Sequence, residues 1–322
     1  MALTVPELVA RTRAGDPRGI ARLISLVENG APELREAMAT LAPHGGRACV
    51  VGLTGAPGVG KSTITSALVR AYRRRSARVG VLAVDPSSPF TGGAVLGDRI
   101  RMQEHSEDPG VFIRSMASRG KLGGLAASTP QALRVLDAAG FDVVLIETVG
   151  VGQSEIDIAT LADTAVVLLA PGMGDAVQAV KAGILEVGDV YVVNKADHDG
   201  AHKTVRELRD ALPGGHPDDG SWVPPVLTTV ASRDEGIDGL VDVLDAHAAW
   251  LRDSGGLERR RRRRAVEEIS AIALSRLRQR IDILDDQGHL GHLADLVAGG
   301  ELDPFTAGDE LLGAGAGAME RR

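Results

Sequence analysis

The sequence predicts an α/β fold, in which a mostly parallel β-sheet is flanked by helices. Short runs rich in β-branched residues alternate with stretches of helical pattern, and each run is continuously apolar. Strands that are buried on both faces have this pattern, and the spacing between runs leaves room for a crossover helix. The expected strands are 47–54, 78–84, 110–115, 141–147, 164–170, 189–194 and 225–230.

Helices are expected before and after this sheet. A capping box from Thr4 to Glu7 and apolar residues at helical spacing predict an N-terminal helical extension over residues 1–45. The sheet domain follows over residues 46–255. Residues 256–322 form a C-terminal helical region, where one long helix carries an apolar stripe that needs a partner. The stripe comprises Val266, Ile269, Ala273, Leu277, Ile281 and Leu284.

The composition argues against several classes of function. A formal net charge of −7 disfavours general affinity for nucleic-acid phosphates, and four Phe, two Trp and two Tyr provide few surfaces for base stacking. No run approaches the ~18 apolar residues that span a bilayer, and the N-terminus lacks the order of a signal peptide. We therefore expect a cytoplasmic protein that binds neither nucleic acid nor membrane. Its one cysteine, Cys49, lies in an apolar run and is expected in the core.

The stretch "GAPGVGKST", residues 55–63, matches the phosphate-binding P-loop pattern between a predicted strand and a predicted helix. Its glycines allow a tight turn whose N–H groups point at phosphate oxygens, and the helix that follows adds its positive end. Lys61 is expected to reach the β and γ phosphates, while Ser62 is placed to ligate Mg²⁺. The predicted nucleotide-binding residues of this loop are Gly55, Pro57, Gly58, Val59, Gly60, Lys61, Ser62 and Thr63.

Three acidic residues, Asp85, Asp98 and Glu147, lie at or beyond the ends of predicted strands. Because the carboxyl ends of parallel strands face one crevice, Asp85 and Glu147 are expected to converge on the nucleotide. All three are candidate Mg²⁺ ligands together with Ser62. Asp98 and Glu147 also join Lys61 as candidate catalytic residues. The alternatives are a solvated strand end for Glu147 and an ordinary polar loop for Asp98.

The stretch "NKAD", Asn194 to Asp197, directly follows a predicted strand and matches the guanine motif N-K-x-D. The Asp197 carboxylate can accept from N1–H and the 2-amino group, donors that adenine does not present together. Asn194 would hold the loop and the O6/N7 edge of the base, and the stem of Lys195 would lie across the ring. Farther on, Ala231 or Ser232 would present a backbone N–H to the guanine O6.

With these motifs the chain resembles the methylmalonyl-CoA mutase-associated GTPases of the MeaB/ArgK type, within the SIMIBI class of P-loop proteins. The resemblance runs from about residue 5 to residue 285. Its most specific part is "VDPSSPFTGGAVLGDRIRM" (84–102), because many GTPases share the P-loop and N-K-x-D. The blocks "IETVGVGQSE", "GDAVQAVKAG" and "NKAD" also match.

The resemblance implies a P-loop GTPase domain with a C-terminal helical dimerisation region. It implies a homodimer that binds GTP and GDP with Mg²⁺ and hydrolyses GTP slowly. The implied partner is the adenosylcobalamin-dependent methylmalonyl-CoA mutase, whose cofactor loading the family gates and which it protects or reactivates. The implied switch segments are 86–102, 147–155 and 172–183.

Within these switches, Gln153, Asp175 and Lys181 are candidates for coupling the nucleotide state to the mutase. Asp175 has an alternative as the cap of an ordinary helix. Gln153 lies three residues past Gly150, not next to it as in Ras-like proteins. No obvious residue therefore orients the attacking water, and we expect slow turnover that rises when the mutase orders the switches.

Other features depart from the family or favour competing functions. The arginine run 259–264 has no family counterpart that we can place, and is expected as a solvated helix end or as a contact for acidic groups on the mutase. "TTVAS" departs from the usual Ser-Ala form, which leaves Ala231 and Ser232 open. A nickel-type metallochaperone GTPase needs a Cys/His cluster, whereas the chain offers Cys49 and the histidine pairs 198/202 and 289/292. A protein kinase of an amino-acid transport system would prefer ATP, which the guanine motif disfavours.

Overall fold

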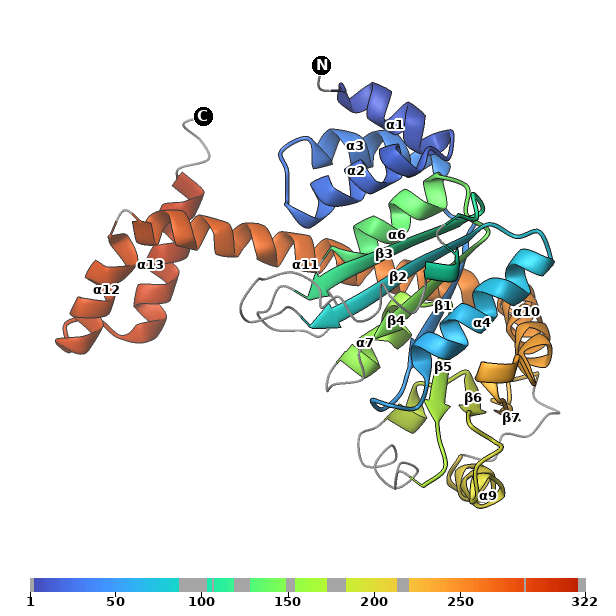
Figure 1. Ribbon diagram of the computed structural model, residues 1–322. Coiled ribbons are helices and arrows are strands. Elements are labelled where there is room, and N and C mark those ends of the chain that lie inside the picture. The colour runs from blue at the N-terminus through green and yellow to red at the C-terminus, as the bar shows by residue number, and fades with distance from the viewer. Residues whose placement is uncertain are drawn as a thin grey trace. The chain divides into compact units, whose positions relative to one another are not determined.

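The computed structural model describes residues 3–86, 103–105, 107–118, 128–148, 154–172, 184–212, 220–286 and 288–317. Its centre is one seven-stranded sheet with the order β3-β2-β4-β1-β5-β6-β7, and every strand pair is parallel (Figure 1). This confirms the α/β fold and the parallel sheet predicted from the sequence. The strands are β1 (Cys49–Thr54), β2 (Val79–Pro86), β3 (Val111–Ser118), β4 (Val143–Thr148), β5 (Thr164–Leu169), β6 (Val190–Val193) and β7 (Val226–Thr228).

The central strands are buried on both faces, as their continuously apolar sequences predict. Every residue of β4 and β5 is buried. Helices α4 (Lys61–Arg74) and α10 (Ile237–Asp253) pack on one face of the sheet, where they share a core with β1, β4 and β5. Helices α6 (Thr129–Ala138) and α7 (Ser154–Leu161) pack on the other face. Helix α9 (Ala201–Ala211) covers β5, β6 and β7 with a smaller core.

The N-terminal extension consists of α1 (Val5–Arg13), α2 (Pro17–Glu28) and α3 (Leu34–Leu41), which lie beside α6 (Figure 1). The predicted capping box is present, because the Thr4 side chain accepts from the Glu7 N–H and the Glu7 carboxylate accepts from the Thr4 N–H. The apolar face of α2 joins the core of the sheet domain. This packing explains the helical spacing of its buried residues, Ile20, Leu23, Ile24 and Val27.

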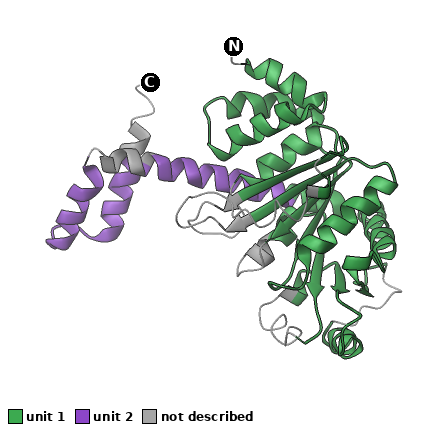
Figure 2. Cartoon of the chain, viewed as in Figure 1, with its two compact units in different colours: residues 1–262 green, residues 263–322 purple. Residues whose placement is uncertain are grey.

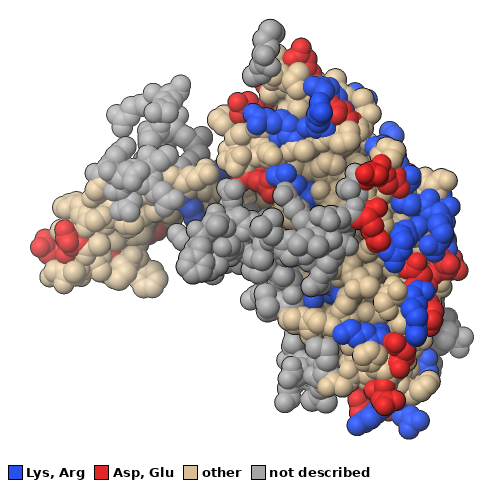
Figure 3. All heavy atoms as spheres, viewed as in Figure 1, with Lys and Arg blue, Asp and Glu red and all other residues tan. Residues whose placement is uncertain are grey.

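Acidic and basic side chains are interspersed on the face of residues 1–262 that Figure 3 shows. Ion pairs join the carboxyl end of α4 to α10. Arg74 lies 2.7 Å from Asp238, and Arg75 lies 2.6 Å from Asp242 and 2.9 Å from Asp245. These pairs are mostly exposed, so each contributes about 1 kcal/mol or less to stability.

The chain divides into two compact units, residues 1–262 and 263–322 (Figure 2). Helix α11 (Gly256–Asp286) begins in the first unit. In the second unit, α12 (His289–Ala298) and α13 (Pro304–Gly317) pack through a small apolar core around Leu293 and Leu311. Val266, Ile269 and Leu277 of the predicted α11 stripe are exposed. Among the helices that the structure describes, none combines the length and the apolar character needed to cross a bilayer.

Two arginines of the run 259–264 are not part of a solvated helix end, because they pair within residues 1–262. Arg260 forms a two-pronged ion pair with Asp189, at 2.6 and 2.7 Å, and also donates to the Asp163 carbonyl oxygen at 2.7 Å. Arg261 donates to the carbonyl oxygens of Gly46 and Ala48. These contacts hold the beginning of α11 against the amino-terminal ends of the strands. The sequence offers no local sign of this, because the two arginines lie within a uniform run.

Candidate nucleotide-binding site

The P-loop leaves β1 and turns into α4 through three glycines with positive φ. These angles are +143° at Gly55, +83° at Gly58 and +95° at Gly60. Side chains rarely adopt such conformations, and at Gly60 an added Cβ would lie 2.5 Å from the Asn194 side-chain nitrogen. The loop therefore requires glycine for its turn and for its close approach to the guanine motif. Helix α4 begins at Lys61, so its amino-terminal end faces the loop, as a phosphate-binding turn requires.

The ammonium group of Lys61 is held by the P-loop itself. Its Nζ donates to the carbonyl oxygen of Gly55 at 2.6 Å and to that of Ala56 at 3.1 Å. The residue is buried, with 7% of its surface exposed. A lysine in this position places a positive charge at the P-loop, which suits bound phosphate.

Glu147, near the carboxyl end of β4, reaches the first turns of α4. Its Oε1 accepts from the Ser62 hydroxyl at 2.5 Å, and its Oε2 lies 2.9 Å from the Thr65 hydroxyl. Only 4% of the residue is exposed, which rules out the alternative of a solvated strand end. Thr65 Oγ1 is also 3.0 Å from the Lys61 carbonyl oxygen, so its one proton serves two acceptors. Register places Glu147 beside Leu53 of β1 and Ala83 of β2.

The Ser62 hydroxyl and the Glu147 carboxylate fit the oxygen chemistry that Mg²⁺ prefers. A carboxylate this buried also favours a nearby cation, because an isolated buried charge costs several kcal/mol. Asp85 lies in β2 two residues beyond Ala83, at the same end of the sheet, and for Asp85 only the backbone position is described. Within the described ranges, no group of three or more His, Cys, Asp or Glu side chains is arranged to hold a metal ion.

Asn194 joins three segments of the site. Its Nδ2 donates to the Val59 carbonyl oxygen at 2.9 Å, and its Oδ1 accepts from the Thr229 hydroxyl at 3.1 Å and from the Ala231 N–H at 3.2 Å. The residue is 3% exposed and follows β6 directly. The side chain thus connects the P-loop, the guanine motif and the loop after β7.

The next residue, Lys195, has a φ of +56°. That conformation costs a residue other than glycine roughly 1–3 kcal/mol, so it marks a position that the surroundings enforce. Its Nζ donates to the Gly58 carbonyl oxygen at 2.7 Å, which brings the lysine stem over the P-loop. Asp197 lies 3.5 Å from Arg233, which also contacts Glu235 at 2.9 Å.

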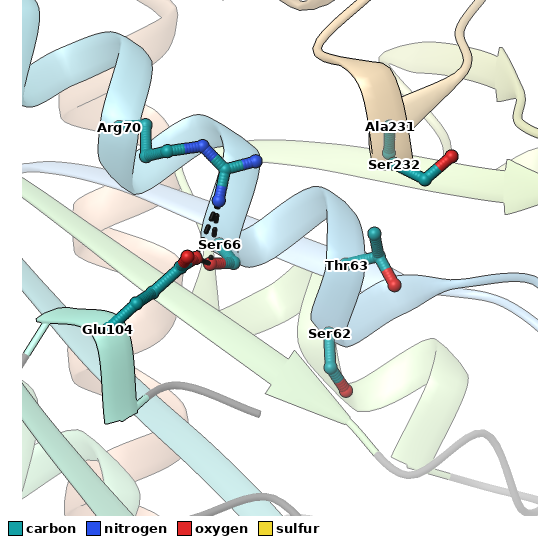
Figure 4. A pocket seen from close by; sticks show the side chains of 7 residues that line it. All are labelled: Ser62, Thr63, Ser66, Arg70, Glu104, Ala231 and Ser232. Carbon is teal, nitrogen blue, oxygen red and sulfur yellow. Dashed lines mark hydrogen bonds and ion pairs between the residues drawn. The ribbon is translucent and has the colours of Figure 1, made fainter. Parts of the chain in front are cut away.

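An open cavity of about 440 Å³ lies along α4 between the P-loop end and the loop after β7. Figure 4 shows Thr63 and Ser62 at the start of the helix and Ser66 and Arg70 farther along it, with Glu104 beside them on a separate segment. Ala231 and Ser232, from the short helix η5 (Ala231–Arg233), form the facing wall. The lining residues are Ser62, Thr63, Ser66, Arg70, Glu104, Ala231 and Ser232.

The structure thus brings together the predicted residues of the P-loop, Glu147, the guanine motif, and Ala231 with Ser232. The candidates Asp98, Gln153, Asp175 and Lys181 lie outside the described residues. Sequence reasoning missed Thr65 and Arg233. Thr65 follows Ser62 by three residues, and helical spacing alone would have placed it on the same face. No comparable local signal marks Arg233, whose contact with Asp197 depends on how the loop after β7 folds.

Comparison with known proteins gives results that agree with this geometry. The model of the family described as methylmalonyl Co-A mutase-associated GTPase MeaB matches residues 20–284. A protein of Pyrococcus abyssi (strain GE5 / Orsay) is 47% identical over 322 residues, which cover 98% of this chain and 99% of the relative. The Caenorhabditis briggsae protein named methylmalonic aciduria type A homolog, mitochondrial, is 37% identical over 276 residues, covering 80% of this chain and 67% of the relative.

Among solved structures, the one titled crystal structure of LAO/AO transport system kinase resembles this chain with a TM-score of 0.70. The two sequences are 27% identical, and the match covers 97% of this chain and 98% of the other. The likeness therefore extends over nearly the whole of both chains.

Proposed function

Because the chain belongs to the family of methylmalonyl-CoA mutase-associated GTPases, we propose that it binds GTP and GDP with Mg²⁺, hydrolyses GTP slowly, and serves an adenosylcobalamin-dependent mutase as a chaperone. The main support for guanine nucleotide binding is the position of the Asn194 side chain. It connects a phosphate-binding loop at Val59 to the loop of Ala231, with the N-K-x-D residues between them.

On the phosphate side, the P-loop N–H groups and Lys61 are proposed to hold the β and γ phosphates and to balance the charge that develops during transfer. Ser62 and Glu147 would hold Mg²⁺, with Asp85 and Asp98 as further proposed ligands. Bound Mg²⁺ would neutralise phosphate charge. Thr65 orients the Glu147 carboxylate through its hydroxyl, at 2.9 Å. Asp98 and Glu147 are also the proposed catalytic carboxylates.

On the base side, Asp197 is proposed to accept from guanine N1–H and the 2-amino group. The stem of Lys195 would cover one face of the ring, which its contact with Gly58 supports. Of the two candidates for the O6 contact, we favour Ser232. The Ala231 N–H donates to Asn194, whereas Ser232 is exposed beside the cavity.

The proposed client is methylmalonyl-CoA mutase. The family description and the name of the Caenorhabditis briggsae relative support this choice. In this proposal, Gln153, Asp175 and Lys181 in the switch segments 147–155 and 172–183 report the nucleotide state to the mutase. The bound state then gates adenosylcobalamin loading and allows the chaperone to protect or reactivate the enzyme.

We also propose that the protein acts as a homodimer through residues 256–322. The support is the exposed apolar face of α11, where Val266 is 55% exposed and Ile269 is 66% exposed. Isolated exposed apolar residues are ordinary, but a row of them at helical spacing favours a helical partner. In this proposal the chain has two further regions, the helical extension at 1–45 and the GTPase domain at 46–255.

A second candidate function comes from the solved structure with a TM-score of 0.70, whose protein is described as a transport system kinase. A kinase of this kind transfers phosphate to a protein, so it would show stable phosphorylation of a partner and a preference for ATP. The contacts around Asn194 and Asp197 favour guanine. The choice between the two functions therefore depends on nucleotide preference.

The first experiment measures GTP and ATP turnover by the purified protein, with and without methylmalonyl-CoA mutase from the same organism. We expect slow GTP turnover that the mutase raises. Asp197→Asn should shift the preference to xanthosine triphosphate, because the amide can pair with the xanthine C2 oxygen. Asp199→Asn, an exposed neighbour, serves as the control. Turnover at several per second without a partner would contradict slow hydrolysis, and preference for ATP would favour the kinase.

A further inference from the structure

Arg70 occupies the outer end of the cavity beside α4 and contacts two loops at once. Its Nε and Nη2 donate to the two carboxylate oxygens of Asp234, at 3.2 and 2.6 Å. Its Nη1 donates to Glu104 at 2.5 Å. Figure 4 shows the Arg70 side chain, on α4, directed toward Ser66 of the same helix and toward Glu104. The guanidinium thus links α4 to the loop after β7 and to the short helix η2 (Gln103–His105).

Asp234 belongs to the same tight turn as the proposed O6-binding residues. The turn is closed by the pair of hydrogen bonds between Val230 and Glu235, and the Asp234 N–H donates to the Ala231 carbonyl oxygen. Asp234 itself has a φ of +57°, a left-handed conformation that must be held by its surroundings. A fork-shaped pair with arginine fixes both the position and the orientation of the carboxylate.

Arg70 is itself held in place. Ser66, one turn earlier on α4, lies 3.3 Å from its Nη1, and the Ser66 hydroxyl contacts Glu104 and lies 2.8 Å from His105 Nε2. The hydrogen bond from Arg70 holds the pKa of Asp234 below its usual value, and the one from Ser66 does the same for Glu104. Both carboxylates are therefore charged partners of Arg70 at neutral pH.

We propose that Arg70 is a positioning residue for guanine binding, which sets the place of the Ala231–Ser232 turn relative to the P-loop helix by fixing Asp234. This inference rests on the proposed function, since it concerns the same nucleotide site. Arg70 does not touch the nucleotide in this proposal. It acts because α4 carries the phosphate-binding end of the site, while the turn after β7 carries the O6-binding end.

The chain offers a matched control on the next turn of the same helix. Arg74 pairs with Asp238 at 2.7 Å, also between α4 and the segment after β7, but Asp238 lies in α10 and not in the turn. If Arg70 served only as a surface ion pair, Arg70→Ala and Arg74→Ala would change nucleotide binding equally little. If Arg70 positions the turn, only Arg70→Ala should weaken binding.

The experiment measures the Kd of GDP with Mg²⁺ by calorimetry, with unlabelled nucleotide. Arg70→Ala is expected to raise the Kd roughly 10-fold, the effect of losing one charged hydrogen-bonded contact, and Arg74→Ala to leave it within about 2-fold. The KM for GTP should rise with little change in kcat, because the base contact that Arg70 positions is the same in the ground state and the transition state. Asp234→Asn, which tolerates positive φ, should reproduce the Arg70→Ala effect, and the double variant should add little.

Arg70→Lys separates geometry from charge. Lysine keeps the charge but cannot form the fork, so we expect it to restore only part of the affinity. If Arg70→Lys bound GDP as tightly as the wild type, the role given to the bidentate geometry would be overturned. Equal affinities of the Arg70→Ala and Arg74→Ala variants, in a wild-type protein that binds GDP tightly, would overturn this inference alone. A wild-type protein that binds no guanine nucleotide would overturn the proposed function as well.

Discussion

Asn194 and Val59 lie 135 residues apart in the chain, yet the Asn194 side chain donates to the Val59 carbonyl oxygen at 2.9 Å. Its oxygen accepts from the Thr229 hydroxyl and the Ala231 N–H, so the buried amide makes three hydrogen bonds to three segments. Buried amides with satisfied donors and acceptors fix the relative position of the segments they join. Here the joined segments are the two halves of a nucleotide site.

Asn194→Ala should therefore damage both stability and binding. The substitution leaves the Val59 carbonyl oxygen and the Ala231 N–H without this partner, which costs about 1–3 kcal/mol of unfolding free energy for each buried group. We expect GDP affinity to fall by at least about 10-fold. Chemical denaturation and calorimetry measure the two effects. His202→Ala, on the exposed side of α9, should change neither, and wild-type affinity in Asn194→Ala would refute the bridging role.

Glu147→Gln tests the proposed metal site. Glutamine has the same shape as glutamate and can still accept from the Ser62 hydroxyl, so the fold should be retained. It lacks the negative charge, so the Mg²⁺ concentration that half-saturates GTP hydrolysis should rise, by roughly 10-fold or more. Glu186→Gln, at an exposed position, is the control. An unchanged Mg²⁺ requirement would show that Glu147 does not hold the ion.

Arg260→Ala should destabilise the protein much more than Arg259→Ala. Arg260 pairs with Asp189, whose side chain is only 11% exposed, so its removal leaves a carboxylate buried without its cation. Breaking such a pair costs about 3 kcal/mol, whereas an exposed substitution such as Arg259→Ala costs about 0.5 kcal/mol or less. Urea unfolding of both variants measures the difference. Equal urea midpoints for the two variants would mean that the Arg260–Asp189 pair makes no net contribution to the stability of the protein.

His247, which lies near Asp189 and Arg260, is expected to cause a loss of stability in mild acid. His247 is fully buried, with Thr164 Oγ1 2.8 Å from its Nδ1 and Trp222 and Trp250 against the ring. Burial lowers the pKa of His247 to about 4; Arg260 also lowers this pKa, and Asp189 opposes the shift. Because the unfolded chain takes up a proton near its ordinary pKa of 6.5, stability is unaffected above that pH and falls as the pH drops toward 4.

The expected loss from this residue is about 2 kcal/mol at pH 5 relative to pH 7.5. Urea midpoints at the two pH values provide the measurement, with His247→Gln for comparison. The variant should be less stable at pH 7.5 but should lose less stability on acidification. If wild type and variant lose the same amount between the two pH values, another group is responsible.

Several features were predictable because they depend on short stretches of sequence. The strands follow from continuously apolar runs, and the P-loop turn follows from glycines at 55, 58 and 60, whose positive φ a glycine adopts at no cost. The guanine motif was recognised from four adjacent residues, and its place after β6 follows from the strand before it. The position of Glu147 at the nucleotide site follows from its place near the end of a parallel strand, and there it contacts Ser62.

Other relationships depend on packing between distant segments and leave no local mark. Arg70 and Arg74 lie one helical turn apart on α4, and nothing in their immediate sequence distinguishes a residue that holds the turn after β7 from one that pairs on the surface. Arg259 and Arg260 are adjacent members of one arginine run, yet only the second meets a buried carboxylate, 71 residues away. Periodicity and turn chemistry are properties of neighbours along the chain, so they can be read from it. The partner of a long polar side chain is chosen by the way helices and strands stack, and that choice exists only in the folded molecule.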